Sequence, residues 1–284
     1  MTATLAGPAT WTASATPPVI DLRGGRKTYT TGSITFEALR GVDVRIDRGE
    51  YVAIMGPSGS GKSTLMNVLG CLDVLTAGTY RLAGHDVGDL DEVELAQMRN
   101  EEIGFVFQQF HLLPSLAAWR NVELPLMYRG VARTERRELA AAALERVGLG
   151  DRLDNRPGEL SGGQQQRVAV ARALVGEPAL ILADEPTGNL DTASTEDVLA
   201  LFDELHAAGR TIVLITHEPE VAERARRVVR VRDGLIQGDG PASALHDDRG
   251  YLHHDGALAT GVTRTDGVRP DDRAIRSDDT QEIR

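Results

Sequence analysis

The sequence predicts an α/β protein with a mostly parallel sheet, an N-terminal antiparallel β subdomain and an inserted α-helical subdomain. Two apolar runs, "ALILADE" at 179–185 and "TIVLITHE" at 211–218, lack the alternation with polar residues that half-exposed strands show. Such runs are typical of parallel strands that are covered on both faces. Helical patterns precede them at 164–175 and 193–208, and this alternation favours helices packed on a largely parallel sheet.

The antiparallel β subdomain is predicted from the stretches that come before the first helix. Turns are predicted at Gly24–Gly25 and Asp47–Gly49, because glycine and aspartate favour turn conformations. Near the other end of the body, "VVRVRDGLIQG" at 228–238 is predicted to form a hairpin with an Asp-Gly turn. The early strand signals are "VIDLR", "KTYTT", "SITFEALRGVDVRI" and "YVAIMG".

Domain limits follow from changes in composition along the chain. Residues of about 85–165 are helix-rich and contain no long buried strand, so we expect them to form the inserted helical subdomain. Residues 1–17 are rich in Thr, Ala and Pro, and residues 241–284 mix Asp, Arg, Gly and Thr with few large apolar residues. Both segments are predicted to be disordered, which leaves 18–240 as the folded domain.

The overall composition excludes several classes of protein. The net charge of −11 argues against nucleic-acid binding, because contacts to phosphates need a basic face. Cys71 is the only cysteine, which excludes an internal disulfide and a cysteine-based zinc site and is typical of a reducing cytosol. The chain has no secretory signal pattern and no run of about 18 uncharged apolar residues, so no membrane span is expected.

The strongest motif is "GPSGSGKST" at 56–64, which follows the strand "YVAIM" and precedes the helical "TLMNVLG". This is the context that a phosphate-binding G-x-x-x-x-G-K-[ST] loop requires. Its glycines let successive amides point at phosphate oxygens, Lys62 can reach the β and γ phosphates, and Ser63 offers a hydroxyl to Mg²⁺. The predicted nucleotide-binding residues are Gly56, Pro57, Ser58, Gly59, Ser60, Gly61, Lys62, Ser63 and Thr64.

Candidate catalytic residues follow the later strands. Asp184 and Glu185 end a buried strand, where open α/β sheets bind ligands, and they predict a Mg²⁺ ligand and a base for the attacking water. A cap on the following turn is an equally open interpretation of this pair. His217 ends the next strand, which favours a sensor of the γ-phosphate over a structural histidine. Gln108 is predicted to reach Mg²⁺ and the water from the helical insert, with Gln109 as the alternative.

A second candidate phosphate site is "LSGGQ" at 160–164, just before an alanine-rich helical pattern. The first amides of a helix have no partner within the helix, and the helix dipole is positive at that end. The segment has neither a lysine nor a Mg²⁺ ligand of its own, so it is too weak to hold ATP unaided.

In order and spacing, "GPSGSGKS", "FVFQ", "LSGGQ", "LILADEPTGNLD" and "ITH" resemble the nucleotide-binding subunit of an ABC transporter over about 18–240. The resemblance implies a P-loop NTPase core, ATP and Mg²⁺ as cofactors, and ATP hydrolysis coupled to transport. It implies that Tyr29, otherwise an ordinary strand aromatic, stacks on adenine and that Asp191 contacts the opposite subunit. Ser161, Gly162, Gly163 and Gln164 would close over the γ-phosphate held by a second, head-to-tail copy.

Shorter motifs, among them "RNEEIGFVFQ" and "NVELPL", are most similar to the lipoprotein-release and macrolide-export ATPases and their cell-division relative. The macrolide exporters carry their membrane domain on the same chain, whereas this sequence ends in a polar tail. The resemblance therefore favours a separate integral-membrane permease, docked near residues 105–127, and a cytoplasmic protein held at the inner face of the membrane. The alternative is a soluble ABC-type ATPase, such as an iron–sulfur assembly component. A non-hydrolysing regulatory module is disfavoured by Glu185 and His217.

Overall fold

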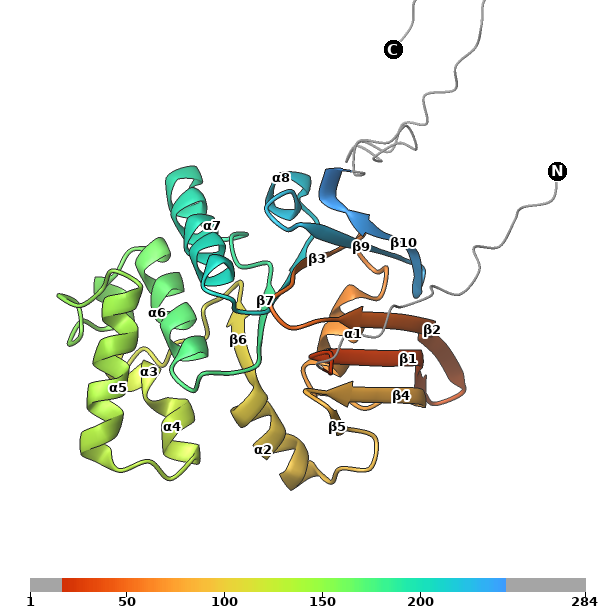
Figure 1. Ribbon diagram of the computed structural model, residues 1–284, viewed down its shortest axis with the longest axis horizontal. Coiled ribbons are helices and arrows are strands. Elements are labelled where there is room, and N and C mark those ends of the chain that lie inside the picture. Colours follow the sequence, from red (N-terminus) through yellow and green to blue (C-terminus); the bar gives the residue numbers. More distant parts are fainter. Residues whose placement is uncertain (1–16, 244–284) are drawn as a thin grey trace, which may run out of the picture. The chain divides into compact units, whose positions relative to one another are not determined.

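The computed structural model describes residues 17–243 (Figure 1). The segments 1–17 and 241–284, for which the sequence predicts disorder, lie outside these residues apart from Pro17 and residues 241–243. Within the described part, no helix combines the length and the apolar character that a membrane crossing requires.

A four-stranded antiparallel sheet forms the predicted N-terminal β subdomain, with strand order β2-β1-β4-β5. Its strands are β1 (Ile20–Thr31), β2 (Ile34–Ile46), β4 (Ala77–Leu82) and β5 (His85–Asp86). The turn predicted at Gly24–Gly25 is wrong, because β1 runs through it and its register with β2 shifts at Gly25. Gly24 has φ +56° and donates its N–H to Asp43 Oδ1 at 2.7 Å. A β-bulge uses the same left-handed glycine conformation as a turn, so the dipeptide alone did not distinguish them.

A six-stranded sheet forms the centre of the fold, with strand order β10-β9-β3-β8-β7-β6. Neighbouring strands are parallel except for β9 and β10, which form the predicted hairpin around Asp233–Gly234. The strands are β3 (Tyr51–Met55), β6 (Ile103–Phe107), β7 (Leu180–Asp184), β8 (Ile212–Thr216), β9 (Arg227–Arg232) and β10 (Leu235–Pro241).

Strand β6 corrects the expectation that residues 85–165 hold no long buried strand. It has five residues, as many as β7, and it pairs with β7 along its whole length. The run "IGFVF" is too short for its periodicity to separate a strand from a helix, and it follows a polar helical pattern without a turn signal. The helical subdomain therefore leaves the central sheet only after Phe107.

Both faces of the central sheet are covered, as the apolar runs predicted. In β3, Tyr51, Ala53 and Met55 face a core shared with α3, α5, α6 and α7. Val52 and Ile54 face a second core, shared with α1 and with the four-stranded sheet. The helices named here are α1 (Lys62–Leu69), α3 (Ala118–Val122), α5 (Arg133–Arg146), α6 (Gly162–Leu174) and α7 (Thr192–Ala207).

The helical subdomain gathers on one side of β6 in Figure 1, with α3, α5 and α6 packed on one another. Helices α6 and α7 match the predicted helical patterns to within two residues at each end. The remaining helices are α2 (Glu92–Glu102), α4 (Leu124–Tyr128), the 3₁₀ turn η1 (Pro157–Glu159) and α8 (Pro219–Ala222).

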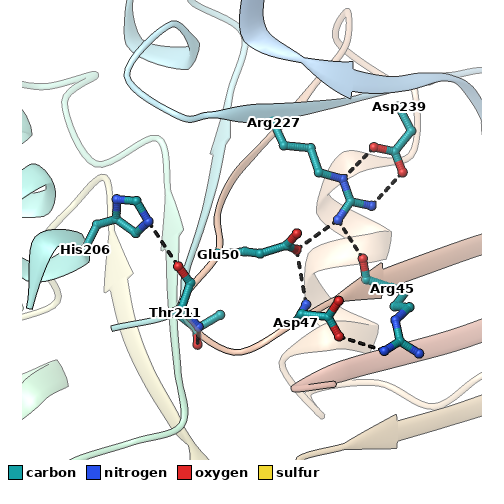
Figure 2. A network of polar contacts seen from close by, with 8 residues as sticks. Arg45, Asp47, Glu50, His206, Thr211, Arg227 and Asp239 are labelled. Atoms are coloured by element: carbon teal, nitrogen blue, oxygen red, sulfur yellow. Dashed lines mark hydrogen bonds and ion pairs between the residues drawn. The ribbon is translucent and has the colours of Figure 1, made fainter. Parts of the chain in front are cut away.

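A polar network joins the two sheets at the edge where β3, β8 and β9 begin (Figure 2). Arg227 of β9 donates to the carbonyl of Arg45 and to Glu50 Oε2 at 2.8 and 2.9 Å. Its Nε and Nη2 donate to the two carboxylate oxygens of Asp239 in β10 at 2.6 and 2.7 Å. The turn between β2 and β3 is held from the other side, where Gly49 bonds to Thr211. The opposite edge, where the parallel strands end, carries the candidate site.

Candidate functional site

Four neighbouring strands of the central sheet deliver the predicted residues to one edge. Met55 at the end of β3 lies opposite Thr216 at the end of β8, and Asp184 at the end of β7 lies opposite Phe107 of β6. The segments that leave these strand ends therefore lie side by side. They are the phosphate loop at 56–61, His217, the pair Asp184 and Glu185, and Gln108.

The phosphate loop is packed so closely that side chains at its two end glycines would not fit. A Cβ on Gly56 would lie 2.0 Å from the carbonyl oxygen of Val231 in β9. Gly61 has φ +104°, and its Cβ would lie 2.8 Å from the carbonyl of Ala38 in β2. The loop is thus a backbone cradle directly before the first turn of the eight-residue helix α1, where free amides favour an anion. These features fit the phosphates of a nucleotide.

Lys62 lies over this cradle. Its Nζ donates to the carbonyls of Gly56 and Pro57 at 2.8 and 2.9 Å. Burial lowers the pKa of Lys62, against the opposing effects of Glu185 and Asp184. Ser58 and Gly59 are exposed at the loop, and Ser63 is exposed on the first turn of α1.

Ser60 differs from its neighbours in the loop. It is only 2% exposed, and within the described part of the chain its hydroxyl has no hydrogen-bond partner. A Cβ on Gly56 would lie 2.7 Å from that hydroxyl, so the side chain is turned inward beneath the loop. Ser60 therefore directs its side chain away from the open face, and its N–H and carbonyl are bonded to Pro57 and Gly234.

Glu185 is held in a defined orientation. Its backbone is left-handed, with φ 44°, and His217 Nδ1 lies 2.7 Å from its Oε1. Thr216 Oγ1 donates weakly to Oε2 at 3.4 Å. The carboxylate is thus directed at β8 and does not cap the turn that follows it. Burial raises the pKa of Asp184, and the charge of Glu185 adds to the shift while Lys62 opposes it.

Gln108 follows β6 directly, so it extends from the central sheet and not from the helical insert as expected. A Cβ on Gly188 would lie 2.5 Å from Gln108 Nε2, which places the amide against the loop after Glu185. Asn189 Nδ2 donates to the main-chain carbonyl of Gln108 at 3.0 Å. The alternative residue, Gln109, is exposed. Ser63, Asp184 and Gln108 offer the hard oxygen ligands that suit Mg²⁺.

Tyr29 of β1 is 38% exposed, and two residues hold its ring. Its hydroxyl donates to Asp73 Oδ2 at 2.9 Å, and Lys27 Nζ lies 2.5 Å from Asp73 Oδ1 and 5.1 Å from the ring centroid. Burial raises the pKa of Tyr29, as does the bond to Asp73, and a contact with Thr64 lowers it. Tyr29 therefore lies beside the phosphate loop. Sequence reasoning missed Lys27 and Asp73, although Lys27 is one of only two lysines in the chain.

The "LSGGQ" segment starts α6, and Ser161 caps it. Gln164 N donates to Ser161 Oγ at 3.3 Å, and Ser161 N donates to Gln164 Oε1 at 3.0 Å. A Cβ on Gly163 would lie 2.8 Å from Ser194 Oγ in α7. Asp191 caps α7 by accepting from Ser194 N and Oγ at 2.9 and 2.8 Å, and these bonds lower its pKa. The structure thus brings the LSGGQ segment and Asp191 together.

Comparisons with known proteins agree with this arrangement. The family model described as "ABC transporter" matches residues 39–188. The uncharacterized ABC transporter ATP-binding protein YknY of Bacillus subtilis (strain 168) is 59% identical over 218 residues, covering 77% of this chain and 95% of that protein. The macrolide export ATP-binding/permease protein MacB of Hyphomonas neptunium is 56% identical over 224 residues, covering 79% of this chain. The chain spans only 35% of that MacB protein.

A solved structure is similar in fold as well as in sequence. It is the dimeric ATP-binding cassette MJ0796 in a post-hydrolysis state bound to ADP and Pi, which is 42% identical with a TM-score of 0.72. The alignment covers 82% of this chain and 100% of that cassette, which confirms the P-loop NTPase core, the antiparallel N-terminal sheet and the helical subdomain. Because a family model matches more than half of the chain and the chain covers nearly all of a 59% identical relative, it belongs to the ABC transporter family as an ATP-binding, ATP-hydrolysing cassette.

Proposed function

We propose that this cassette hydrolyses ATP as one half of a head-to-tail pair and thereby drives a separate integral-membrane permease of the export, lipoprotein-release or mechanotransmission type. The observation that carries the proposal is the separation of two phosphate-binding elements in one chain. The phosphate loop leads into α1 beside the four-stranded sheet, whereas the LSGGQ segment starts α6 beside α3 and α5 (Figure 1). A γ-phosphate on the loop of one copy is therefore met by the LSGGQ segment of another copy.

The residues at the sheet edge support hydrolysis at this interface. The loop amides and Lys62 hold the phosphates, and the oxygens of Ser63, Asp184 and Gln108 would hold Mg²⁺, which neutralises phosphate charge. Glu185 accepts a proton from the water that attacks the γ-phosphorus, and the bond from that phosphorus to the bridging oxygen breaks to release ADP and phosphate. His217 keeps the carboxylate oriented for this step.

The LSGGQ segment offers a matching surface. Beside it lies a polar cavity of about 360 Å³, and its lining includes Ser161, Gly163 and Gln164 of the LSGGQ segment and Ser194 and Asp197 of α7. Ser161 and the first amides of α6 would close over the γ-phosphate of the partner copy, while Tyr29 of that copy stacks on adenine. Dimeric structures are known for the similar cassette MJ0796, which supports pairing.

A groove between the central sheet and the helical subdomain suits the permease. It has a volume of about 400 Å³ and is lined by β6, α4 and the ends of α2 and α6, with Phe105, Leu124 and Tyr128 among its apolar side chains. Tyr128 is 84% exposed. A short amphipathic helix from the cytoplasmic side of a permease would cover these residues and hold the cassette at the membrane. MacB and the pyoverdine exporter PvdT, both described as ATP-binding/permease proteins, support coupling to a membrane domain.

The pairing is tested with Glu185→Gln, which keeps the shape of the side chain but removes its charge and basicity. Hydrolysis should fall by about 100-fold or more while ATP still binds, so the ATP-bound dimer should accumulate. Adding Ser161→Arg places a bulky cation in the cradle and should leave an ATP-bound monomer. Adding Ser161→Ala instead removes the hydroxyl and its helix cap but places neither bulk nor charge in the cradle, and the first amides of α6 remain. It is the matched control, and it should dimerise more readily than the Ser161→Arg protein.

Light scattering with and without Mg-ATP gives the result, both on the cassette alone and on protein purified from detergent extracts together with any membrane protein that it binds. A Glu185→Gln/Ser161→Arg protein that dimerises with ATP as readily as the Ser161→Ala control would contradict the head-to-tail arrangement. Recovery of the cassette in a soluble assembly, with no membrane protein attached, would favour the alternative of a soluble ABC-type ATPase.

A further inference from the structure

The segment that follows Gln108 contains two consecutive non-glycine residues in the left-handed region. Phe110 has φ 58° and His111 has φ 48°. Residues with a Cβ rarely adopt this conformation, and adjacent pairs are rarer because each residue is disfavoured separately. Such a segment persists only where its surroundings hold it.

Arg172, in the last turn of α6, supplies that restraint. Its Nη1 donates to the carbonyl of His111 at 2.6 Å, and its Nη2 donates to the carbonyl of Phe110 at 2.8 Å. The two arms of one guanidinium thus hold two successive peptide units, which fixes both the position and the direction of the segment. The His111 ring packs on Phe107 at 4.9 Å between centroids, at the end of β6.

No acidic partner among the described residues accounts for the positive charge of Arg172. No carboxylate within the described residues contributes to the pKa of its guanidinium, which partial burial alone lowers. Arg172 is half-buried, and a cation withdrawn in part from solvent without a charged partner is unfavourable unless its hydrogen bonds are well made. Here they are made to the main chain of a strained segment.

The held segment is connected to both halves of the proposed site. Gln108 lies two residues before Phe110 and packs against Gly188. A Cβ on Gly162, at the start of α6, would lie 3.9 Å from the ring of Phe110. Arg172, His111 and Phe107 also line the groove between the central sheet and the helical subdomain.

We propose that Arg172 is a positioning residue for ATP hydrolysis, which clamps the Phe110–His111 segment to α6 so that Gln108 and the LSGGQ segment keep one mutual arrangement. The proposal rests on the function proposed for Gln108. It gives α6 a second task, since the helix both presents the LSGGQ segment to a partner copy and sets the position of Gln108 in its own copy. An occupant of the groove would contact the clamp directly.

The test is a double-mutant cycle on the full-length chain, with Arg172→Met and Gln108→Ala alone and together. Arg172→Met should lower kcat about tenfold and change KM for ATP and the affinity for a fluorescent ATP analogue by less than about twofold. In the Gln108→Ala background the same substitution should lower kcat by less than about twofold, because there is no longer an amide to position. Arg172→Lys, which keeps the charge but not the fork, should give an intermediate kcat.

Arg146→Met is the matched control, because Arg146 is an exposed arginine in the last turn of α5. It should leave kcat unchanged. An equal fall in kcat in both backgrounds, or a loss of nucleotide affinity parallel to the loss of kcat, would overturn the proposal by showing a general structural role. If Arg172→Met does not fold, the same comparison with Arg172→Lys decides the matter. A wild-type chain that does not hydrolyse Mg-ATP would refute the proposed function itself, which is a separate outcome.

Discussion

The carboxylate of Asp184 is influenced by two charges of opposite sign in a partly buried position. Burial and Glu185 raise its pKa, and Lys62 lowers it, with a net upward shift. The folded protein therefore disfavours the ionised form that would bind Mg²⁺. As pH rises from the ordinary aspartate value of 3.8 through the raised pKa, the fold loses stability relative to the unfolded chain.

Asp184→Asn should abolish ATPase activity, because it removes the carboxylate that would bind Mg²⁺. The same change should raise the melting temperature at about pH 8, because it removes an unfavourable charge. The gain should shrink as the pH is lowered toward the ordinary aspartate pKa, where the wild-type carboxyl is protonated. Calorimetry over a pH series, with ATPase assays at neutral pH, measures both effects. Asp154→Asn, on an exposed site in the helical subdomain, is the control and should change neither. A melting temperature that falls at about pH 8 would contradict this account.

At the scale of elements, the β9–β10 turn supports the phosphate loop from behind. Gly234 donates its N–H to the carbonyl of Ser60 at 2.9 Å and accepts from Arg40 N at 2.8 Å. It has φ +74°, and a Cβ there would lie 2.7 Å from the carbonyl of Ala38. The hairpin turn thus contacts the phosphate loop directly and helps to fix its position.

Gly234→Ala should lower the free energy of unfolding by about 2–3 kcal/mol, from the left-handed backbone and the clash together, and weaken ATP binding several-fold. Gly209→Ala is the matched control, because Gly209 has φ +86° but no atom lies within 4 Å of its Cβ position. That variant should lose about 1 kcal/mol and bind ATP normally. Urea unfolding and nucleotide titration of both variants give the comparison, and equal losses of ATP affinity would contradict it.

The sequence predicts those parts of the fold in which one residue type, such as glycine in a loop, or one spacing of apolar residues dominates a short segment. The loop at 56–64, the buried strands and the Asp233–Gly234 hairpin are of this kind. Strand β6 was not predicted, because five apolar residues carry no decisive period and the evidence for a strand is its pairing with distant β7. The bonds from Arg172 to Phe110 and His111 join residues about 60 apart, and nothing in their sequence marks them.

At the scale of the whole molecule, Arg227 connects the two sheets. It bonds to the end of β2, to Glu50 and to Asp239 at once (Figure 2). Its side chain is 17% exposed, while Glu50 and Asp239 are 34% and 24% exposed, so solvent screens the pairs in part. The network lies at the sheet edge away from the nucleotide.

Arg227→Met should therefore lower the free energy of unfolding by about 2–3 kcal/mol, less than for a fully buried pair, and leave ATP affinity within about twofold. Arg232→Met, on the same strand with a surface partner 3.8 Å away, is the control and should lose about 0.5 kcal/mol or less. Unfolding by urea, which is uncharged and so does not itself screen ion pairs, is measured at low and high salt for both variants. A large fall in ATP affinity for Arg227→Met would show that the sheets are coupled through to the opposite edge.

The position of β3 in the sheet has a consequence for how the protein is made. The strand that leads into the phosphate loop lies between β8 and β9, and Tyr51 pairs with Ile212, about 160 residues later. At the usual speed of translation, roughly 10–30 s pass between the synthesis of these two residues. During that interval β3 has an unpaired edge on both sides, and ATP has no completed cradle to stabilise. A complete nucleotide site therefore forms only after β8 and β9 have been synthesised, and the apolar strand "YVAIM" has no partner strand until then.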